Sequence, residues 1–375
     1  MRLTGSYLFS ALSVFCLTVF LIGRPAVASA TPVRSDSVQS APAQALALSQ
    51  RPESEATPQR IGRISLDVVV TNKAGAPVSG LDVKDFTVLD DGRPAKVLSF
   101  QEVNKLTQKA GPPAEVILLI DTVNVGFTPV ARAREEIQTF LRQNGGHLAY
   151  PVTVFAFAND GVKILVQPSA DGNAEASQLE QADNGLRTIT RSAGAYGAIE
   201  RFQLSIQWLQ VVANNMAKRP GRKLLIWVGP GWPMLDRQNI ETSSKGAEQL
   251  FKSIVDFSTT LREGHIELSS VSLGEPGPGT FLYQDFLKGV KTADKANPPN
   301  LGVKVIAAQS GGRVMAPDNG LAGQIDKCVE DGADFYMISF DPPAADKPNE
   351  YHDLKVQVDK AGLAARTNTG YYNQP

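Results

Sequence analysis

Residues 116–120 are all apolar, end in Asp121 and constrain the fold of this chain more than any other feature. A run without polar alternation is typical of a strand that is buried on both faces of a parallel sheet. A helical pattern follows, with Thr128 as the expected N-cap and Pro129 as the first helical residue. Because strands and helices then alternate along the chain, we predict an α/β domain over residues 112–333, with a mainly parallel sheet that is covered on both faces.

Apolar periodicity and the turn residues around it predict the other elements of this domain. Strands are expected at 152–158, 224–228, 266–273 and 313–315, with 162–166 as an antiparallel partner of the first. Helices are expected at 199–216, 247–261, 301–308 and 321–329.

Short strands are predicted on both sides of the α/β domain. Alternating apolar residues predict a strand at 64–70, and two more are joined by an Asp-Gly turn, in which we interpret Asp90 and Asp91 as turn residues only. Three further strands are expected at 335–340, 354–358 and 364–372. Since neither group closes a core alone, we expect residues 60–104 and 334–375 to pair into one β-sandwich, with the α/β domain inserted between them.

Residues 1–30 have the layout of a secretory signal. Arg2 precedes an apolar stretch of sixteen residues, and Ala28-Ser29-Ala30 supplies small residues for cleavage. We therefore expect an exported protein, periplasmic or secreted; an uncleaved anchor is the alternative, although a membrane span needs ~20 apolar residues. Residues 31–59 are rich in Ser, Pro, Ala and Gln, so we predict a disordered linker there.

The composition excludes several classes of protein. The 375 residues include 37 basic and 38 acidic side chains, so a net charge of -1 gives no general attraction for nucleic acid. The single long apolar run excludes a multispan membrane protein, and we expect no span after signal cleavage. Two cysteines cannot form a disulfide framework, and we interpret Cys328 as a buried thiol on an apolar helix face.

The strand ending in Asp121, the long helix after it and the strand at 224–228 follow the element order of a von Willebrand factor A (VWA) domain. Other matching stretches are Val68-Val69-Val70-Thr71, Asp85-Phe86-Thr87-Val88, Pro220-Gly221-Arg222-Lys223, Ser310-Gly311-Gly312-Arg313 and Lys355-Val356-Gln357-Val358. Through them the chain, from residue 64 to 372, resembles the VWFA-related proteins of the Acidobacteria type. This resemblance implies an exported protein with a Rossmann-like, adhesion-type α/β domain and no established enzymatic activity.

Domains similar to VWA commonly hold magnesium in a metal-ion-dependent adhesion site, through a D-x-S-x-S loop, a threonine and a second aspartate. This chain keeps Asp121, but valines stand at both hydroxyl positions of the first loop, and valine offers no oxygen ligand. The loops at Ser192 and at 229–231 lack the expected threonine and aspartate. We therefore expect a degenerate site and no metal cofactor. A remodelled magnesium site at Asp121, Asn124 and Ser192 is the alternative.

No catalytic constellation is recognisable in the sequence, so we expect no enzymatic activity. His147, His265 and His352 lack the spacing of a metal motif, and we interpret them as surface or edge residues. The glycine-rich segment 274–280 lacks the lysine of a phosphate-binding loop. A hydrolase with dispersed catalytic groups stays a third hypothesis.

An insert at 274–300 follows a predicted parallel strand, at the edge where α/β sheets bind ligands. It contains Phe281, Tyr283 and Phe286, and Trp232 follows the neighbouring strand at the same edge. We hypothesise that these four rings contact a protein partner; the alternative is that the insert folds back and buries them. The leading interpretation is an exported, non-enzymatic interaction protein, and a metal-dependent protein binder is the second.

Overall fold

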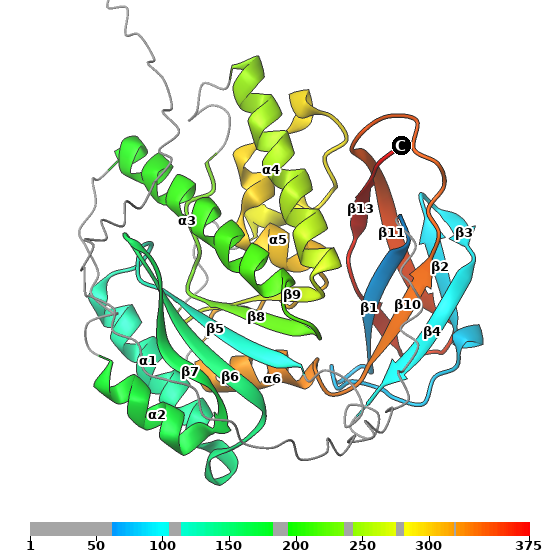
Figure 1. The fold of residues 1–375 in the computed structure, drawn as a ribbon. Coiled ribbons are helices and arrows are strands. Elements are labelled where there is room, and N and C mark those ends of the chain that lie inside the picture. The colour runs from blue at the N-terminus through cyan, green and yellow to red at the C-terminus, as the bar shows by residue number, and fades with distance from the viewer. Residues whose placement is uncertain (1–61, 105–113, 183–193, 236–242, 275–280, 319) are drawn as a thin grey trace, which may run out of the picture. The chain divides into compact units, whose positions relative to one another are not determined.

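The computed structural model describes residues 62–104, 114–182, 194–235, 243–274, 281–318 and 320–375 (Figure 1). The predicted signal segment 1–30, the predicted linker 31–59 and Ser192 lie outside these residues. No helix within the described ranges is long and apolar enough to span a bilayer.

A five-stranded sheet in the order β7-β6-β5-β8-β9 forms the centre of the α/β domain. Its four parallel strands are β5 (Glu115–Asp121), β6 (His147–Ala158), β8 (Lys223–Val228) and β9 (Ile266–Val271). The edge strand β7 (Gly161–Asp171) runs antiparallel to β6, as the sequence predicts. The carboxyl ends of the parallel strands therefore meet at one edge of the sheet.

Strand β5 is buried on both faces, as its uninterrupted apolar sequence predicts. Val116 and Leu118 belong to one apolar core, whereas Ile117 and Leu119 belong to the other. All four side chains are 0% exposed, so β5 packs against the helices on both faces of the sheet.

Helices cover both faces of this sheet (Figure 1). On one face lie α1 (Phe127–Arg142), α2 (Gly172–Gln181) and α6 (Leu321–Glu330). On the other lie α3 (Gly194–Ala217), α4 (Ser244–Glu263) and α5 (Val303–Gln309). Short 3-10 turns follow β9 in the insert: η5 (Leu282–Phe286), η6 (Ala293–Lys295) and η7 (Pro298–Leu301).

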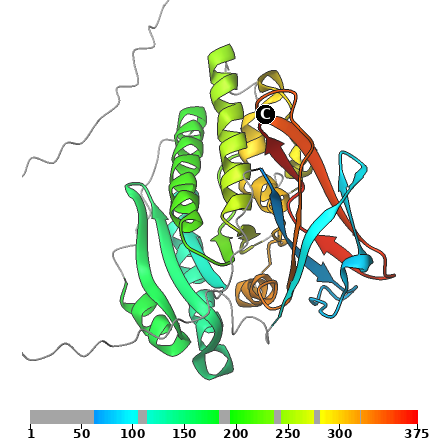
Figure 2. The same ribbon diagram turned by 45° about the vertical axis from the view of Figure 1, so that its right-hand side comes forward.

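Strands from both ends of the chain form two further antiparallel sheets, in the orders β12-β1-β10-β4 and β13-β11-β2-β3. The N-terminal strands are β1 (Ile64–Thr71), β2 (Phe86–Asp90), β3 (Arg93–Ala95) and β4 (Val97–Val103). The C-terminal strands are β10 (Phe335–Phe340), β11 (Glu350–Val358), β12 (Ala364–Arg366) and β13 (Gly370–Asn373). In Figure 2 the blue and cyan strands interleave with the orange and red ones. The two sheets share one apolar core, and the predicted fold class is confirmed.

Several predicted boundaries are wrong. At the N-terminal end the Asp-Gly turn joins β2 to an additional short strand, β3, and the strand expected around Val97 and Phe100 is β4 of the other sheet. At the C-terminal end the strand expected at 364–372 divides into β12 and β13, one in each sheet. Helix α1 begins at Phe127 with Gly126 at the N-cap, so Thr128 does not cap it. Helix α2, with its Asp171 cap, is absent from the prediction, and the strand expected at 313–315 is a single bridge from Val314 to Ser270.

A cluster of buried charges joins the antiparallel sheets to the α/β domain. Asp331 is 0% exposed and accepts hydrogen bonds from Arg313 (2.7 Å) and from Arg366 of β12 (2.6 Å). Burial opposes ionisation of Asp331, but its hydrogen bonds to Arg313 and the charges of both arginines outweigh burial and lower its pKa. Beside it, Arg222 pairs with Glu267, and both side chains are buried.

Asp331→Asn should destabilise the protein by ~3 kcal/mol, because it leaves two partly buried guanidinium groups without their counter-charge. Urea unfolding at pH 7 measures this loss. Since folding lowers the pKa of Asp331, its stabilisation is present at neutral pH and disappears as the pH falls through that pKa. The matched control is Asp256→Asn, which breaks an exposed pair with Lys252 and should cost less than ~0.5 kcal/mol. Equal stability of the two variants would contradict this role.

Candidate functional site

The carboxyl edge of the parallel sheet carries the candidate site. Asp121 ends β5 there, and the segment from Gly229 to Trp232 leaves β8 beside it. Gly229 has a φ of +152°, and a Cβ at this residue would lie 2.7 Å from the Cβ of Asp121. Glycine is therefore needed for the close approach of the two loops.

Asp121 is buried and held by four hydrogen bonds. Its Oδ1 accepts from the backbone amides of Val123 (3.0 Å) and Asn124 (2.9 Å). The side-chain amide Nδ2 of Asn124 lies 3.2 Å from Oδ1 and 3.0 Å from Oδ2, and it also donates to Oγ of Ser205 on α3 (3.1 Å). Burial raises the pKa of Asp121 to about 6, and the hydrogen bonds from Asn124 offset part of that rise.

This arrangement differs from the donor set that a magnesium ion needs. The amide nitrogen of Asn124, not its oxygen, faces the Asp121 carboxylate. Among the described residues that line the two cavities at this edge, Asp121 is the one carboxylate. The described residues therefore do not fit a site built from several hard oxygen ligands.

The larger of these cavities has a volume of about 500 Å³ and is lined by two cations. Arg201 comes from α3 and Lys304 from the first turn of α5, and neither makes an ion pair within the described part of the chain. Burial lowers the pKa of Lys304. Trp232 and Tyr283 also line the cavity, so the site combines positive charge with aromatic surface.

A second cavity of about 220 Å³ adjoins the first, since Pro230 and Leu273 line both. Its wall is apolar apart from Asp121, and it includes Val130 and Leu321 from the helices on the opposite face.

The four predicted contact rings differ in exposure. Trp232 is 4% exposed, donates from Nε1 to the carbonyl of Leu301 (3.1 Å), and packs edge-on against Trp227. Of the two alternatives for the insert, Trp232 therefore agrees with the one in which the insert folds back and buries the ring, and its predicted contact with a partner is wrong. Tyr283 and Phe286 are half-buried, whereas Phe281 is 66% exposed. Its neighbour Leu282 is 51% exposed, so an apolar rim lies beside the cavity that Leu282 helps to line.

The solved structures that are similar to this chain include the following two. One is the manganese-loaded TRAP protein of Plasmodium vivax, with a TM-score of 0.33, 11% identity, and coverage of 72% of this chain and 97% of that chain. The other is the SpRpn10 VWA domain, with a TM-score of 0.28, 10% identity, and coverage of 57% and 94%. No family model and no curated protein matches the chain. The fold is assigned from its own strand order and direction, and the narrower family type stays a prediction.

Asn124→Ala should raise the pKa of Asp121 from about 6 to about 7, because it removes the side-chain donor that favours the carboxylate. An NMR titration of the Asp121 carboxyl carbon measures the change. Since folding raises the pKa of Asp121 above its ordinary value of 3.8, the protonated carboxyl stabilises the folded state fully below pH ~4, and this stabilisation is lost as the pH rises through the folded pKa. Ser205→Ala is the control, since it leaves both Asn124 bonds to Asp121 in place and should leave the pKa near 6. If Asn124→Ala lowered the pKa of Asp121, the Asn124 side chain would not be the donor that favours the carboxylate.

Trp232→Ala and Phe281→Ala should differ strongly in their effect on the free energy of unfolding. We expect a loss of ~3 kcal/mol for Trp232→Ala, because it opens a cavity and leaves the Leu301 carbonyl without its donor. Phe281→Ala should change stability by less than ~0.5 kcal/mol, since this ring is mostly exposed. Thermal and urea unfolding of both variants measure the difference. If Trp232→Ala lowered the free energy of unfolding by as little as Phe281→Ala does, the insert would not pack over this ring.

Proposed function

We propose that this chain is an exported, non-enzymatic protein-interaction protein, which binds its partner at the carboxyl edge of the parallel sheet without a metal ion. The observation that carries the proposal is the cavity of about 500 Å³, where Arg201 and Lys304 meet aromatic side chains and no described lining residue is acidic. Export rests on the predicted signal segment at residues 1–30.

The chemistry of the cavity favours an acidic side chain of a partner. Two cations in a partly desolvated cavity attract a carboxylate more strongly than they would at an open surface. The exposed rings and aliphatic groups of Phe281 and Leu282 add apolar area that a partner can cover.

One observation favours the second candidate, a metal-dependent binder. The side-chain oxygen of Asn124 is buried and has no hydrogen-bond partner among the described residues. An amide oxygen in this position can serve a hard cation together with Asp121 if the amide turns. The third ligand that the sequence suggests for a remodelled site, Ser192, lies outside the described residues.

Site-specific photo-crosslinking in cells that produce the protein tests the first candidate. We expect a photoreactive phenylalanine analogue at Phe281 to give a discrete adduct with one partner protein. The same analogue at Ile164, which is 54% exposed on strand β7, is the control and should not give that adduct. Arg201→Gln combined with Lys304→Gln should weaken the Phe281 adduct, and washing with a chelator should not.

An adduct that forms equally at both positions would contradict a specific edge site. An adduct lost in chelator would instead support the remodelled metal site.

A further inference from the structure

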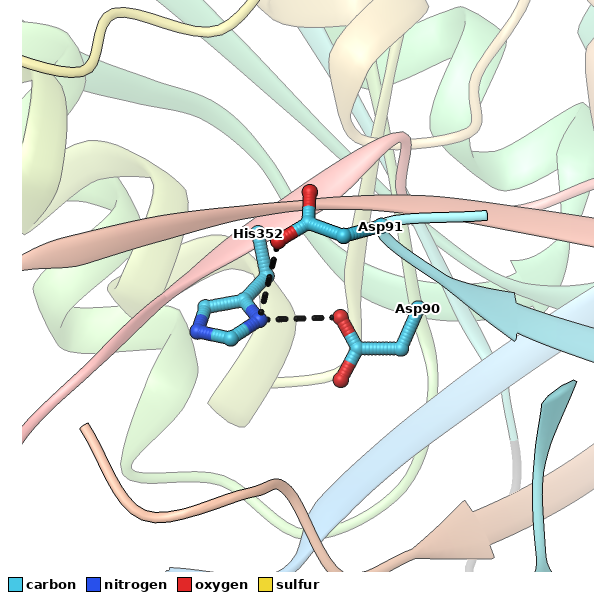
Figure 3. Close-up of side chains that lie close together, drawn as sticks. All are labelled: Asp90, Asp91 and His352. Atoms are coloured by element: carbon cyan, nitrogen blue, oxygen red, sulfur yellow. Dashed lines mark hydrogen bonds and ion pairs between the residues drawn. The ribbon is translucent and has the colours of Figure 1, made fainter. Parts of the chain in front are cut away.

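A second group of polar side chains lies in the antiparallel sheets, away from the carboxyl edge. Asp90 ends β2, Asp91 occupies the turn into β3 with a φ of +46°, and His352 lies on β11, which pairs with β2. Figure 3 shows both carboxyl groups directed toward the same ring nitrogen of His352, Nδ1. His352 is 6% exposed and lies on an inner strand of its sheet, so its interpretation as a surface or edge residue is wrong.

Three potential ligand atoms converge in this group. Nδ1 of His352 lies 2.9 Å from Oδ1 of Asp90 and 3.4 Å from Oδ2 of Asp91. Within the described part of the chain, this is the group of histidine and acidic side chains whose ligand atoms all lie within 4.8 Å of one another. The spacing matches neighbouring ligands around one small ion with bonds of ~2.0–2.2 Å.

Groups outside the three residues hold the other carboxylate oxygens. The hydroxyl of Tyr371 donates to Oδ2 of Asp90 (2.8 Å), and the backbone amide of Asp353 donates to Oδ1 of Asp91 (3.0 Å). The Tyr371 ring also stacks on His352, with centroids 4.9 Å apart and an interplanar angle of 18°. Such outer contacts orient the ligands of metal sites in proteins.

A hydrogen bond alone leaves this geometry incompletely explained. Nδ1 carries at most one hydrogen, and the short contact to Asp90 uses it, so Nδ1 cannot also donate to Oδ2 of Asp91, which lies 3.4 Å away. The other ring nitrogen, Nε2, is buried without a described partner whichever form the ring takes, so it does not distinguish the alternatives. A divalent cation between the three atoms would satisfy both carboxylates at once.

We propose that Asp90, Asp91 and His352 form a zinc-class metal site, with Nδ1 and one oxygen from each carboxylate as ligands. A nitrogen ligand favours zinc or a related transition metal over magnesium. Asp91, whose side chain is 43% exposed, gives the ion a path from solvent and leaves room for water as a further ligand. Because β2 and β11 come from opposite ends of the chain, the ion would fasten the N-terminal strands to the C-terminal ones.

Cobalt and zinc titrations of the purified protein test this site. We expect Co²⁺ to give visible d–d absorption that saturates at one ion per chain, and Zn²⁺ to displace it and to raise the melting temperature. Asp91→Asn should weaken binding at least about tenfold, and His352→Gln should abolish it. His147→Gln, at an exposed histidine, and Asp121→Ala, at the sheet edge, should leave it unchanged.

Far-UV circular dichroism confirms that each variant is folded. Asp91→Asn changes an exposed turn residue, so it remains informative if the buried His352→Gln fails to fold. The proposal is overturned if no absorption or heat appears up to millimolar metal. It is equally overturned if folded Asp91→Asn and His352→Gln proteins bind as the natural sequence does, and the group is then a hydrogen-bonded link alone.

Discussion

Asp331 is the buried charge on which the rest of the structure depends. Its carboxylate joins Arg313, which lies between α5 and α6 of the α/β domain, to Arg366 on a C-terminal strand. A carboxylate at 0% exposure is tolerated only with its cations in place, so each partner fixes the position of the other. The nearby bond from His265 to Asp67 of β1 (3.1 Å) adds an N-terminal strand to the same junction. Strands from both ends of the chain are therefore attached to the amino-end side of the parallel sheet, away from the carboxyl edge where we propose that a partner binds.

At that edge, the acidic and the basic side chains lie in different environments. The acidic residue, Asp121, is enclosed and supplied with hydrogen bonds by the loop that follows it. The basic residues, Arg201 and Lys304, line an open cavity and have no ion-pair partner within the described residues. A buried anion with its own donors needs no cation, whereas unpaired cations attract an anion from elsewhere. This contrast is the physical basis for proposing a partner that brings its own carboxylate.

Local patterns in the sequence predict most of the fold but only part of the site. The apolar run at 116–120 predicts a strand buried on both faces, and the valines after Asp121 predict a changed ligand set. Both predictions depend only on residues that are adjacent in the sequence. The pairing of His352 with Asp90 joins residues 262 positions apart and has no local signal. Arg201 and Lys304 likewise line one cavity only because α3 and α5 both reach the carboxyl edge of the sheet. The sequence left open whether Trp232 contacts a partner or is covered by the insert, because the fold-back of the insert depends on packing, which periodicity does not reveal.

The central claim is that the carboxyl edge binds its partner without a metal ion at Asp121. Calorimetry with Mg²⁺ and Mn²⁺ tests this claim most directly. The titrations compare the natural sequence with Asp121→Ala and His352→Gln. The account predicts that Asp121→Ala leaves the heats unchanged, and that any Mn²⁺ binding present is lost in His352→Gln alone. Saturable binding at or below ~1 mM, the weak end for extracellular sites of hard cations, that disappears in Asp121→Ala would contradict the account. It would show that the edge keeps a working adhesion-type metal site despite its valines.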